Sequence, residues 1–325
     1  MNIQSFVDAL AILDSNPPSF GISERRRNAF LEIGRFFEES IRPGREYDLK
    51  RNPGPIRQLI DPRLAAAVAN VAATSLAEDQ VTAWQMYNHG VIVKAGRVAI
   101  GLDVIPFTRA FGWNEPAGLT DSIADAIDAL LVTHSHADHY DESLIRACLE
   151  RGKPVLMPEP MTGKWVSHPA LHAVADGSTH ELSGLHIKAR RGIHLWRKDA
   201  DEVPLTYYEI TCPRGFRFIF GGDVDYTKRF EKTPGADIDL FFLPWRNPNE
   251  IYEPGHPAQE ATTIDAVRIA IERIRPAAML YEHCAELDHV YEGFPASFDV
   301  ALELQRLVRI SSELMFWGER MGLRA

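Results

Sequence analysis

An apolar segment ends directly in a run of potential metal ligands, and this run constrains the fold more than any other part of the chain. Residues 129–132 have the pattern of a buried strand, and His134, His136, Asp138 and His139 follow within seven positions. In extended backbone, residues i and i+2 point to the same side, so His134 and His136 can reach one cation. Asp138 and His139 follow where the loop turns toward a helix, so they can approach a second cation. Imidazole and carboxylate groups suit zinc, manganese or iron.

The remaining apolar patterns predict an α+β fold with many short strands. A strand is expected at residues 83–88, 91–94, 97–105, 128–133, 153–158, 185–191, 205–211, 216–222, 238–244 and 277–283. Helical periodicity falls between some of them, at 141–150, 258–275 and 297–318. The regular strand–helix alternation of a doubly wound parallel sheet is absent. The order therefore favours two sheets covered by helices.

The first 80 or so residues differ from the rest because their periodicity is helical. One helix is expected from Ser23 to Glu39, before Pro43 and Gly44, and a second is expected to begin near Asp61 and Pro62. The chain is accordingly divided into a helical N-terminal extension, 1–80, and a main domain, 81–325.

Charge and cysteine content exclude several classes of protein. There are 35 Lys and Arg against 45 Asp and Glu, a net charge of −10, which argues against a nucleic-acid partner. Cys148, Cys212 and Cys284 are far apart and form no disulfide framework. No apolar run approaches the ~20 residues that a membrane helix needs. The first residues lack the basic start of a signal peptide, so a cytoplasmic protein without membrane insertion is expected.

The sequence HSHADH at a strand end resembles the signature of the metallo-β-lactamase-fold hydrolases. His194 in RRGIHLW, Asp223 in FRFIFGGDVDY and His283 in AAMLYEH match the later ligand positions of that family, and the resemblance covers residues 83–290. It implies an αββα sandwich, with the ligands on loops at one edge of the two sheets. It also assigns His134, His136 and His194 to a first metal; Asp138, His139 and His283 to a second; and Asp223 to both.

Two further assignments follow from this resemblance. Asp103 matches a position where the family often keeps an acid near the site, and it is expected to orient a ligand imidazole. His289 lies close enough to His283 to be the alternative last ligand. The other histidines, His89 among them, lack metal-like spacing and are expected to be surface or hydrogen-bonding residues.

The resemblance implies a binuclear hydrolase in which two divalent ions, zinc first and manganese or iron otherwise, share a hydroxide. Asp138 and Asp223 are the expected catalytic carboxylates. True β-lactamases of this fold usually have cysteine at the position of Asp223, which argues against antibiotic hydrolysis. The local sequences look most like the branch of ascorbate-phosphate lactonase and N-acyl-phosphatidylethanolamine phospholipase D. A small lactone or phosphoester is therefore the expected substrate.

Residues beside the ligands are candidates for substrate contact. Arg246 is expected to bind an anionic group, and aromatic or cationic side chains could stack on or pair with the substrate: Tyr140, Trp196, Arg197 and Trp245. An iron-dependent oxidoreductase on the same fold remains the main alternative. A metal-dependent nuclease is a further one, which the acidic balance disfavours. The partners expected are a small-molecule substrate and, as a possibility, further copies of the chain.

Overall fold

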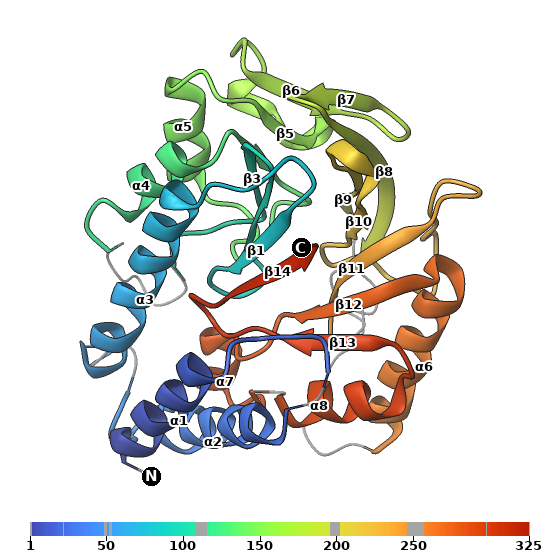
Figure 1. Cartoon of the computed structure of the whole chain (residues 1–325). Coiled ribbons are helices and arrows are strands. Elements are labelled where there is room, and N and C mark those ends of the chain that lie inside the picture. The colour runs from blue at the N-terminus through green and yellow to red at the C-terminus, as the bar shows by residue number, and fades with distance from the viewer. Residues whose placement is uncertain are drawn as a thin grey trace.

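The fold of the chain is built on two mixed sheets of seven strands each (Figure 1). The computed structural model describes residues 2–21, 23–48, 51, 54–107, 116–195, 202–245, 257–296 and 298–324. The first sheet has the order β14–β1–β2–β3–β4–β5–β6. Its strands are β1 (Val81–Gln85), β2 (Val91–Ala95), β3 (Val98–Leu102), β4 (Ala129–Leu131), β5 (Val155–Pro158), β6 (Leu171–Val174) and β14 (Arg320–Arg324).

The second sheet has the order β13–β12–β11–β10–β9–β8–β7. Its strands are β7 (Thr179–Leu182), β8 (Leu185–Leu195), β9 (Glu202–Thr211), β10 (Arg217–Phe220), β11 (Ile238–Pro244), β12 (Pro276–Glu282) and β13 (Ser311–Leu314). Each sheet is antiparallel in one half and parallel in the other: β3, β4, β5 and β6 run parallel in the first, as do β10, β11, β12 and β13 in the second. The carboxyl ends of parallel strands lie at one edge of a sheet, which is where loops can assemble a site.

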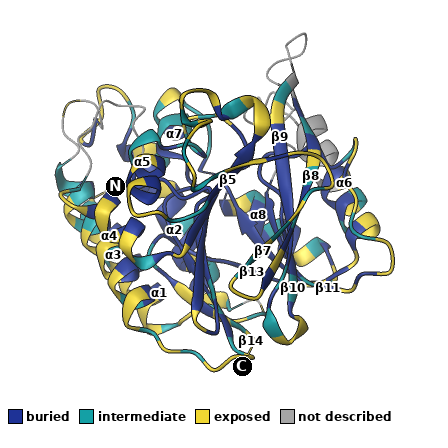
Figure 2. Ribbon diagram, turned by 90° about the horizontal axis from the view of Figure 1, so that it is seen from above, coloured by how far each residue is buried: buried dark blue, intermediate teal, exposed yellow. Residues whose placement is uncertain are grey.

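Alternating side chains of each strand enter two different apolar cores. Val91 and Val93 of β2 lie in the core between the sheets, where they meet Phe218 and Phe242 of the second sheet, whereas Ile92 faces the helices outside the first sheet. Because both faces of the sheets pack against a core, the interior strands are mostly buried. The helices cover the outside and keep one face exposed (Figure 2). The αββα sandwich expected from the sequence is confirmed.

Helices cover the outer faces of both sheets (Figure 1). Helices α3, α4 and α5 lie outside the first sheet, and α6 and α8 lie against the second. The helices are α1 (Ile3–Ser15), α2 (Glu24–Ser40), α3 (Gly54–Ala73), α4 (Leu119–Ala126), α5 (Glu142–Glu150), α6 (Pro257–Ile274), α7 (Leu287–Glu292) and α8 (Phe298–Leu307), with short 3₁₀ turns η1 (Glu159–Met161), η2 (Gly163–Trp165) and η3 (Pro213–Gly215). In the described part of the chain, no helix combines the length and the apolar character needed to cross a membrane.

Several expected boundaries were wrong. The helix predicted near Asp61 begins at Gly54, with Pro62 inside it, because Ile56 and Ile60 extend its buried face toward the N-terminus. The helix predicted over 297–318 ends at Leu307, and its second half forms β13, which pairs in parallel with β12. The predictions also missed α1, α4, α7, β6, β7 and β14.

The N-terminal helices share one core with the C-terminal part of the chain. The ring of Phe6 in α1 stacks on Phe36 in α2, with centroids 4.9 Å apart, and lies 6.4 Å from Phe316. Phe37 stacks on Trp317 at 5.9 Å. The contacts of Phe6 with Phe316 and of Phe37 with Trp317 join the start of the chain to the turn between β13 and β14. Because β14 pairs with β1, the N-terminal helices support the edge of the first sheet.

A buried cluster of charged side chains also joins the N-terminal helices to the turn between β13 and β14. The guanidinium of Arg26 in α2 donates to both carboxylate oxygens of Glu319, at 2.7 and 2.8 Å. It also donates to the carbonyl oxygens of Asn16 and Leu314, each at 2.8 Å, and its Nε lies 3.7 Å from Glu313. One guanidinium therefore faces two buried carboxyl groups and can fully pair with only one of them.

This imbalance predicts a pH dependence of stability. Burial, reinforced by Glu319 and opposed by Arg26, raises the pKa of Glu313 to about 7. The folded chain thus binds a proton that the unfolded chain releases near pH 4.5, so this group should lower the free energy of unfolding as pH rises from about 4.5 to 7. The expected loss is about 3 kcal/mol. Urea unfolding at pH 5 and pH 8 should show this slope in the wild type and a flatter one in Glu313→Gln; identical slopes would contradict the assignment.

Candidate metal centre

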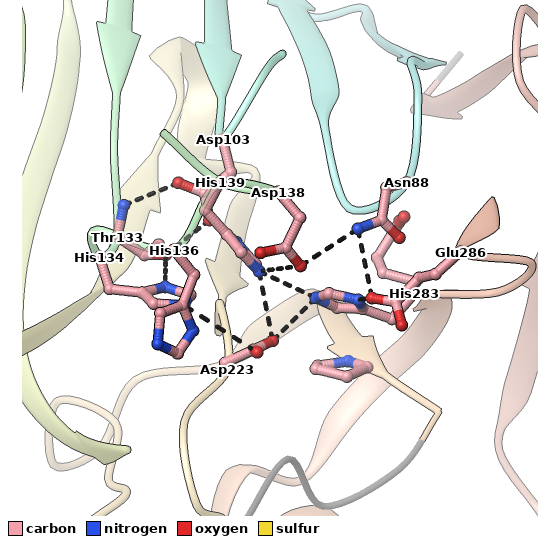
Figure 3. Close-up of polar contacts among 12 residues, drawn as sticks. Asn88, Asp103, Thr133, His134, His136, Asp138, His139, Asp223, His283 and Glu286 are labelled. Carbon is pink, nitrogen blue, oxygen red and sulfur yellow. Dashed lines mark hydrogen bonds and ion pairs between the residues drawn. The ribbon is translucent and has the colours of Figure 1, made fainter. Parts of the chain in front are cut away.

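The seven residues expected as ligands come together at the edge of the sandwich where parallel strands of both sheets end (Figure 3). His134 follows β4 of the first sheet. His194 lies near the end of β8, Asp223 follows β10, and His283 directly follows β12, all in the second sheet. The site therefore requires both sheets, and His134 and His283, 149 positions apart in the sequence, meet in it.

The first group consists of His134, His136, His194 and Asp223, whose ligand atoms all lie within 4.8 Å of one another. Nδ1 of His136 faces Nε2 of His134 at 3.0 Å and Nε2 of His194 at 3.1 Å. Oδ2 of Asp223 lies 4.0 Å from His134 Nε2 and 3.9 Å from His194 Nε2. Three imidazole nitrogens and one carboxylate oxygen thus converge on one point, as four-coordinate zinc requires.

A buried hydrogen-bond network determines which nitrogen of His134 faces this point. Asp103, which is fully buried, accepts the backbone N–H of Thr133 at 2.7 Å and its hydroxyl at 2.6 Å. Because the Thr133 hydroxyl donates to Asp103, it accepts from Nδ1 of His134, which lies 3.0 Å away. The proton of His134 is therefore on Nδ1, and the lone pair of Nε2 points at the other imidazoles. Asp103 thus contacts His139 directly and His134 through Thr133, and its role in orienting these candidate ligands stays a prediction.

The second group consists of Asp138, His139 and His283. Nε2 of His139 lies 3.0 Å from Nε2 of His283 and 3.3 Å from Oδ2 of Asp138. The outer nitrogen of each imidazole binds a carboxylate: Nδ1 of His139 bonds Asp103 at 2.7 Å, and Nδ1 of His283 bonds Glu286. Imidazoles that bind metal in proteins usually have such an outer partner.

Asp223 joins the two groups. Its Oδ2 faces the first group, while its Oδ1 lies 2.8 Å from His283 Nε2 and 3.5 Å from His139 Nε2. One carboxylate can therefore contribute an oxygen to each of two cations. His136 and Asp138 are the partly exposed members of the set, which leaves the site open to solvent on their side.

The electrostatics of the two groups differ. Burial and the neighbouring imidazoles lower the pKa of His134 well below its usual value and that of His136 to about 4, so both are neutral and present lone pairs. Burial alone would also lower the pKa of His139 and His283. The adjoining carboxylates outweigh it and raise the pKa of His139 well above its usual value and that of His283 to about 10. The second group thus has a surplus of negative charge that positive charge must balance. Both donor sets suit divalent cations.

A glycine packs directly against this network and gives a sharp prediction. Gly222 has φ +53°, and a Cβ there would lie 2.6 Å from the Thr133 hydroxyl oxygen. Gly152 has a similar φ of +67° but nothing within 4 Å. Gly152→Ala should cost about 1–2 kcal/mol of unfolding free energy, from the left-handed backbone alone. Gly222→Ala should cost about 1–3 kcal/mol more, because Thr133 must move. Urea denaturation measures both; equal losses would show that the close approach is not a constraint.

The structure places the residues that were expected to contact substrate in different surroundings. Trp196, Arg197 and Arg246 lie outside the described residues. Tyr140 is half-buried, packs against the core, and its hydroxyl accepts from Trp165 Nε1 at 3.3 Å. Trp245, expected beside the substrate, is instead 2% exposed and donates to the backbone carbonyl of His283 at 2.8 Å. It therefore holds the backbone of a candidate ligand.

Several residues that contact the candidate ligands were not predicted from the sequence, among them Thr133, Glu286 and His89. Thr133 lies between the strand and the first histidine, and Glu286 lies three positions after His283. His89, expected as a surface or hydrogen-bonding residue, is fully buried between candidate ligands, and neither ring nitrogen has a hydrogen-bond partner among the described residues. The spacing His-x-x-Glu is a signal that could have indicated Glu286. His289 is partly exposed, contacts Glu286, and is in neither group of candidate ligands.

Comparison with known families now places the chain. A family model described as the Beta-lactamase superfamily domain matches residues 105–284, more than half of the 325 residues and all seven candidate ligand positions. The chain belongs to the β-lactamase superfamily. Asp103, Asn88, His89 and Glu286 lie outside the matched range. The comparison with curated proteins found no match.

Solved structures support the metallo-β-lactamase fold of this superfamily member. CmlA, a diiron β-hydroxylase from Streptomyces venezuelae, aligns with a TM-score of 0.52 at 15% identity, over 77% of this chain and 55% of that one. A possible metal-dependent hydrolase from Veillonella parvula aligns with a TM-score of 0.52 at 12% identity, over 75% and 99%. The metallo-β-lactamase fold protein YhfI from Bacillus subtilis aligns with a TM-score of 0.50 at 11% identity, over 75% and 99%. At these identities the likeness concerns the fold alone. The present chain spans about half of the hydroxylase.

Proposed function

We propose that this chain is a binuclear metal-dependent hydrolase acting on a small lactone or phosphoester. The observation that carries the proposal is the position of Asp223, whose two oxygens face two separate groups of ligand atoms. The first group would hold one cation with His134, His136 and His194, and the second would hold another with Asp138, His139 and His283.

Two divalent cations, when bound, would lower the pKa of coordinated water toward about 7 and polarise the bond to be cleaved. The chain's own residues supply orientation and proton handling. Asp138 has a side chain 29% exposed, so its carboxylate can accept a proton from solvent at the open side of the site. The buried network of Asp103 and Thr133 fixes His134 and His139 before any substrate arrives.

Other features support hydrolysis at the metal site over alternatives. Burial raises the pKa of the Cys284 thiol well above its usual value, so this neighbour of His283 is not an activated nucleophile. The net charge of −10 disfavours a nucleic-acid substrate. The lactone or phosphoester class rests on the resemblance of the segments around the ligands to the lactonase and phospholipase branch, and zinc is the first candidate metal.

The test combines metal analysis with a substrate screen. Full-length protein purified without added metal should contain two zinc or manganese ions per chain and should hydrolyse a lactone or a phosphodiester in a panel of small substrates. His136→Ala should reduce that activity by at least about 100-fold, since even loss of an outer partner of a ligand costs 10- to 100-fold. His172→Ala, an exposed histidine on β6, is the matched control. One iron per chain with oxygen consumption and no hydrolysis would favour the oxidoreductase alternative and refute the proposal.

A further inference from the structure

The turn between β1 and β2 enters the metal centre from outside the range that the family model covers. Its five residues are Met86, Tyr87, Asn88, His89 and Gly90. The side-chain amide of Gln85 fixes the turn by donating to the carbonyl oxygens of Asn88, at 2.8 Å, and Gly90, at 3.3 Å. A Cβ on Gly90 would lie 3.1 Å from the Asp103 carbonyl oxygen, so the turn packs tightly against the strand end that carries Asp103.

The amide of Asn88 connects the Asp138 carboxylate of the second group with the carboxylate of Glu286, the partner of His283 (Figure 3). Its Nδ2 donates to Oδ2 of Asp138 and to Oε1 of Glu286, each at 3.3 Å. An amide nitrogen has two hydrogens, one for each acceptor. Glu286 in turn accepts from Nδ1 of His283. Asn88 is 3% exposed and has φ +55°, a backbone conformation that asparagine tolerates better than most residues.

The ring of His89 lies against both imidazoles of the same group. Its centroid is 4.6 Å from that of His283, with the rings 30° apart, and 5.0 Å from that of His139. On another side it contacts Phe220, at 4.6 Å. His89 is fully buried, so its ring fills the space behind the two candidate ligands.

We infer that Asn88 and His89 are positioning residues that build the second cation site and leave the first untouched. Asn88 holds the Asp138 carboxylate and, through Glu286, the tautomer of His283. His89 holds the planes of His139 and His283 by packing. His134, His136 and His194 take their orientation from other contacts, such as that between His134 and Thr133. The inference rests on the proposed function, because it presupposes two cations.

Loss of outer partners of this kind usually lowers metal affinity by 10- to 100-fold. Asn88→Gly should therefore weaken binding of one of two cations by about 10- to 100-fold and leave the affinity of the other within about 3-fold. Glycine is chosen because it adopts a positive φ without strain, so the variant removes the amide and little else. His89→Ala should also weaken one cation selectively, whereas His89→Phe should retain it, since a ring still fills the space.

The experiment is a titration of full-length, chelator-stripped protein with Co²⁺, followed by visible absorption and by competition with a chromophoric chelator. The wild type is expected to bind two equivalents. Asn70→Ala, at an asparagine of α3 that bonds Trp84 and Arg320, is the control and should match the wild type at both steps. Thermal melting of the metal-free variants checks that each is folded.

Each outcome decides the inference. Selective loss of one equivalent in Asn88→Gly and His89→Ala supports it. Two unchanged equivalents, or both weakened alike, would overturn the inference while leaving the proposed function standing. Loss in His89→Phe as large as in His89→Ala would overturn the packing role of the ring. A wild type that binds fewer than two cations would refute the proposed function, and the inference with it.

Discussion

Asp223→Ala is expected to abolish both metal binding and hydrolysis. Each oxygen of this carboxylate faces a different group of ligand atoms, and Oδ1 lies 2.8 Å from His283 Nε2. Its removal takes one donor from each cation and also removes negative charge next to His139 and His283. Activity on the substrate found by screening should fall by at least about 100-fold, and metal content should fall from two ions toward none. Elemental analysis after gel filtration and steady-state kinetics measure the two effects.

Asp121→Ala is the matched control for this variant. Asp121 has a side chain 69% exposed and pairs with Arg151 on the surface, so it should keep wild-type metal content and kinetics. Asp223→Asn retains the shape of the side chain and should lose metal almost as completely, because an amide offers the cations one neutral oxygen in place of two charged ones. If Asp223→Ala retained two metal ions and full activity, the carboxylate would not join the two groups.

Arg26→Ala should produce a large loss of stability although it lies outside the metal centre. The substitution leaves Glu319 and Glu313 buried, with side chains 4% and 5% exposed, and without their cation. Breaking a buried pair by removing one partner costs about 3–5 kcal/mol. It also frees the carbonyl oxygens of Asn16 and Leu314, so α1, α2 and the β13–β14 turn would lose their common anchor. Urea denaturation gives the free energy of unfolding.

Arg35→Ala provides the contrast. Arg35 lies in the same helix and pairs with Glu32, but the two side chains are 52% and 41% exposed. Removing such an exposed pair should change the unfolding free energy by less than about 1 kcal/mol. Equal effects of the two substitutions would mean that the buried cluster adds nothing to the docking of the N-terminal helices.

The sequence was most informative about the candidate metal ligands that follow directly after a strand. His134, His136, Asp138 and His139 lie within one short segment, so their convergence depends on local geometry alone. The more distant residues, His194, Asp223 and His283, lie at or directly after the ends of strands. Only the resemblance to a family joined them to the cluster, and the structure brings all of them within reach.

The surroundings of the ligands could not be predicted in the same way. Asn88 and His89 occupy a turn between two strands, and only the pairing of β1 with β2 and the approach of β12 bring them to the site. Trp245 follows a buried strand as the ligands do, but its indole points to the His283 backbone rather than to open space. Such contacts depend on tertiary packing and leave no periodic pattern in the sequence.

The prediction of several strands failed for a related reason, since these strands depend on pairing with distant parts of the chain. β14 has only five residues and exists because it pairs with β1 at the edge of the first sheet. β13 continues the apolar spacing of α8, yet its parallel pairing with β12 overrides the helical period. β6 and β7 are short and mostly exposed, so their alternation is weak.

The central claim is that side chains from both sheets hold a pair of cations. Anomalous scattering from a crystal of the full chain grown with Zn²⁺, recorded on both sides of the zinc absorption edge, tests it most directly. The account predicts two peaks, one enclosed by His134, His136 and His194 and the other by Asp138, His139 and His283, with Asp223 reaching both. A single peak, or zinc bound only elsewhere on the molecule, would contradict it.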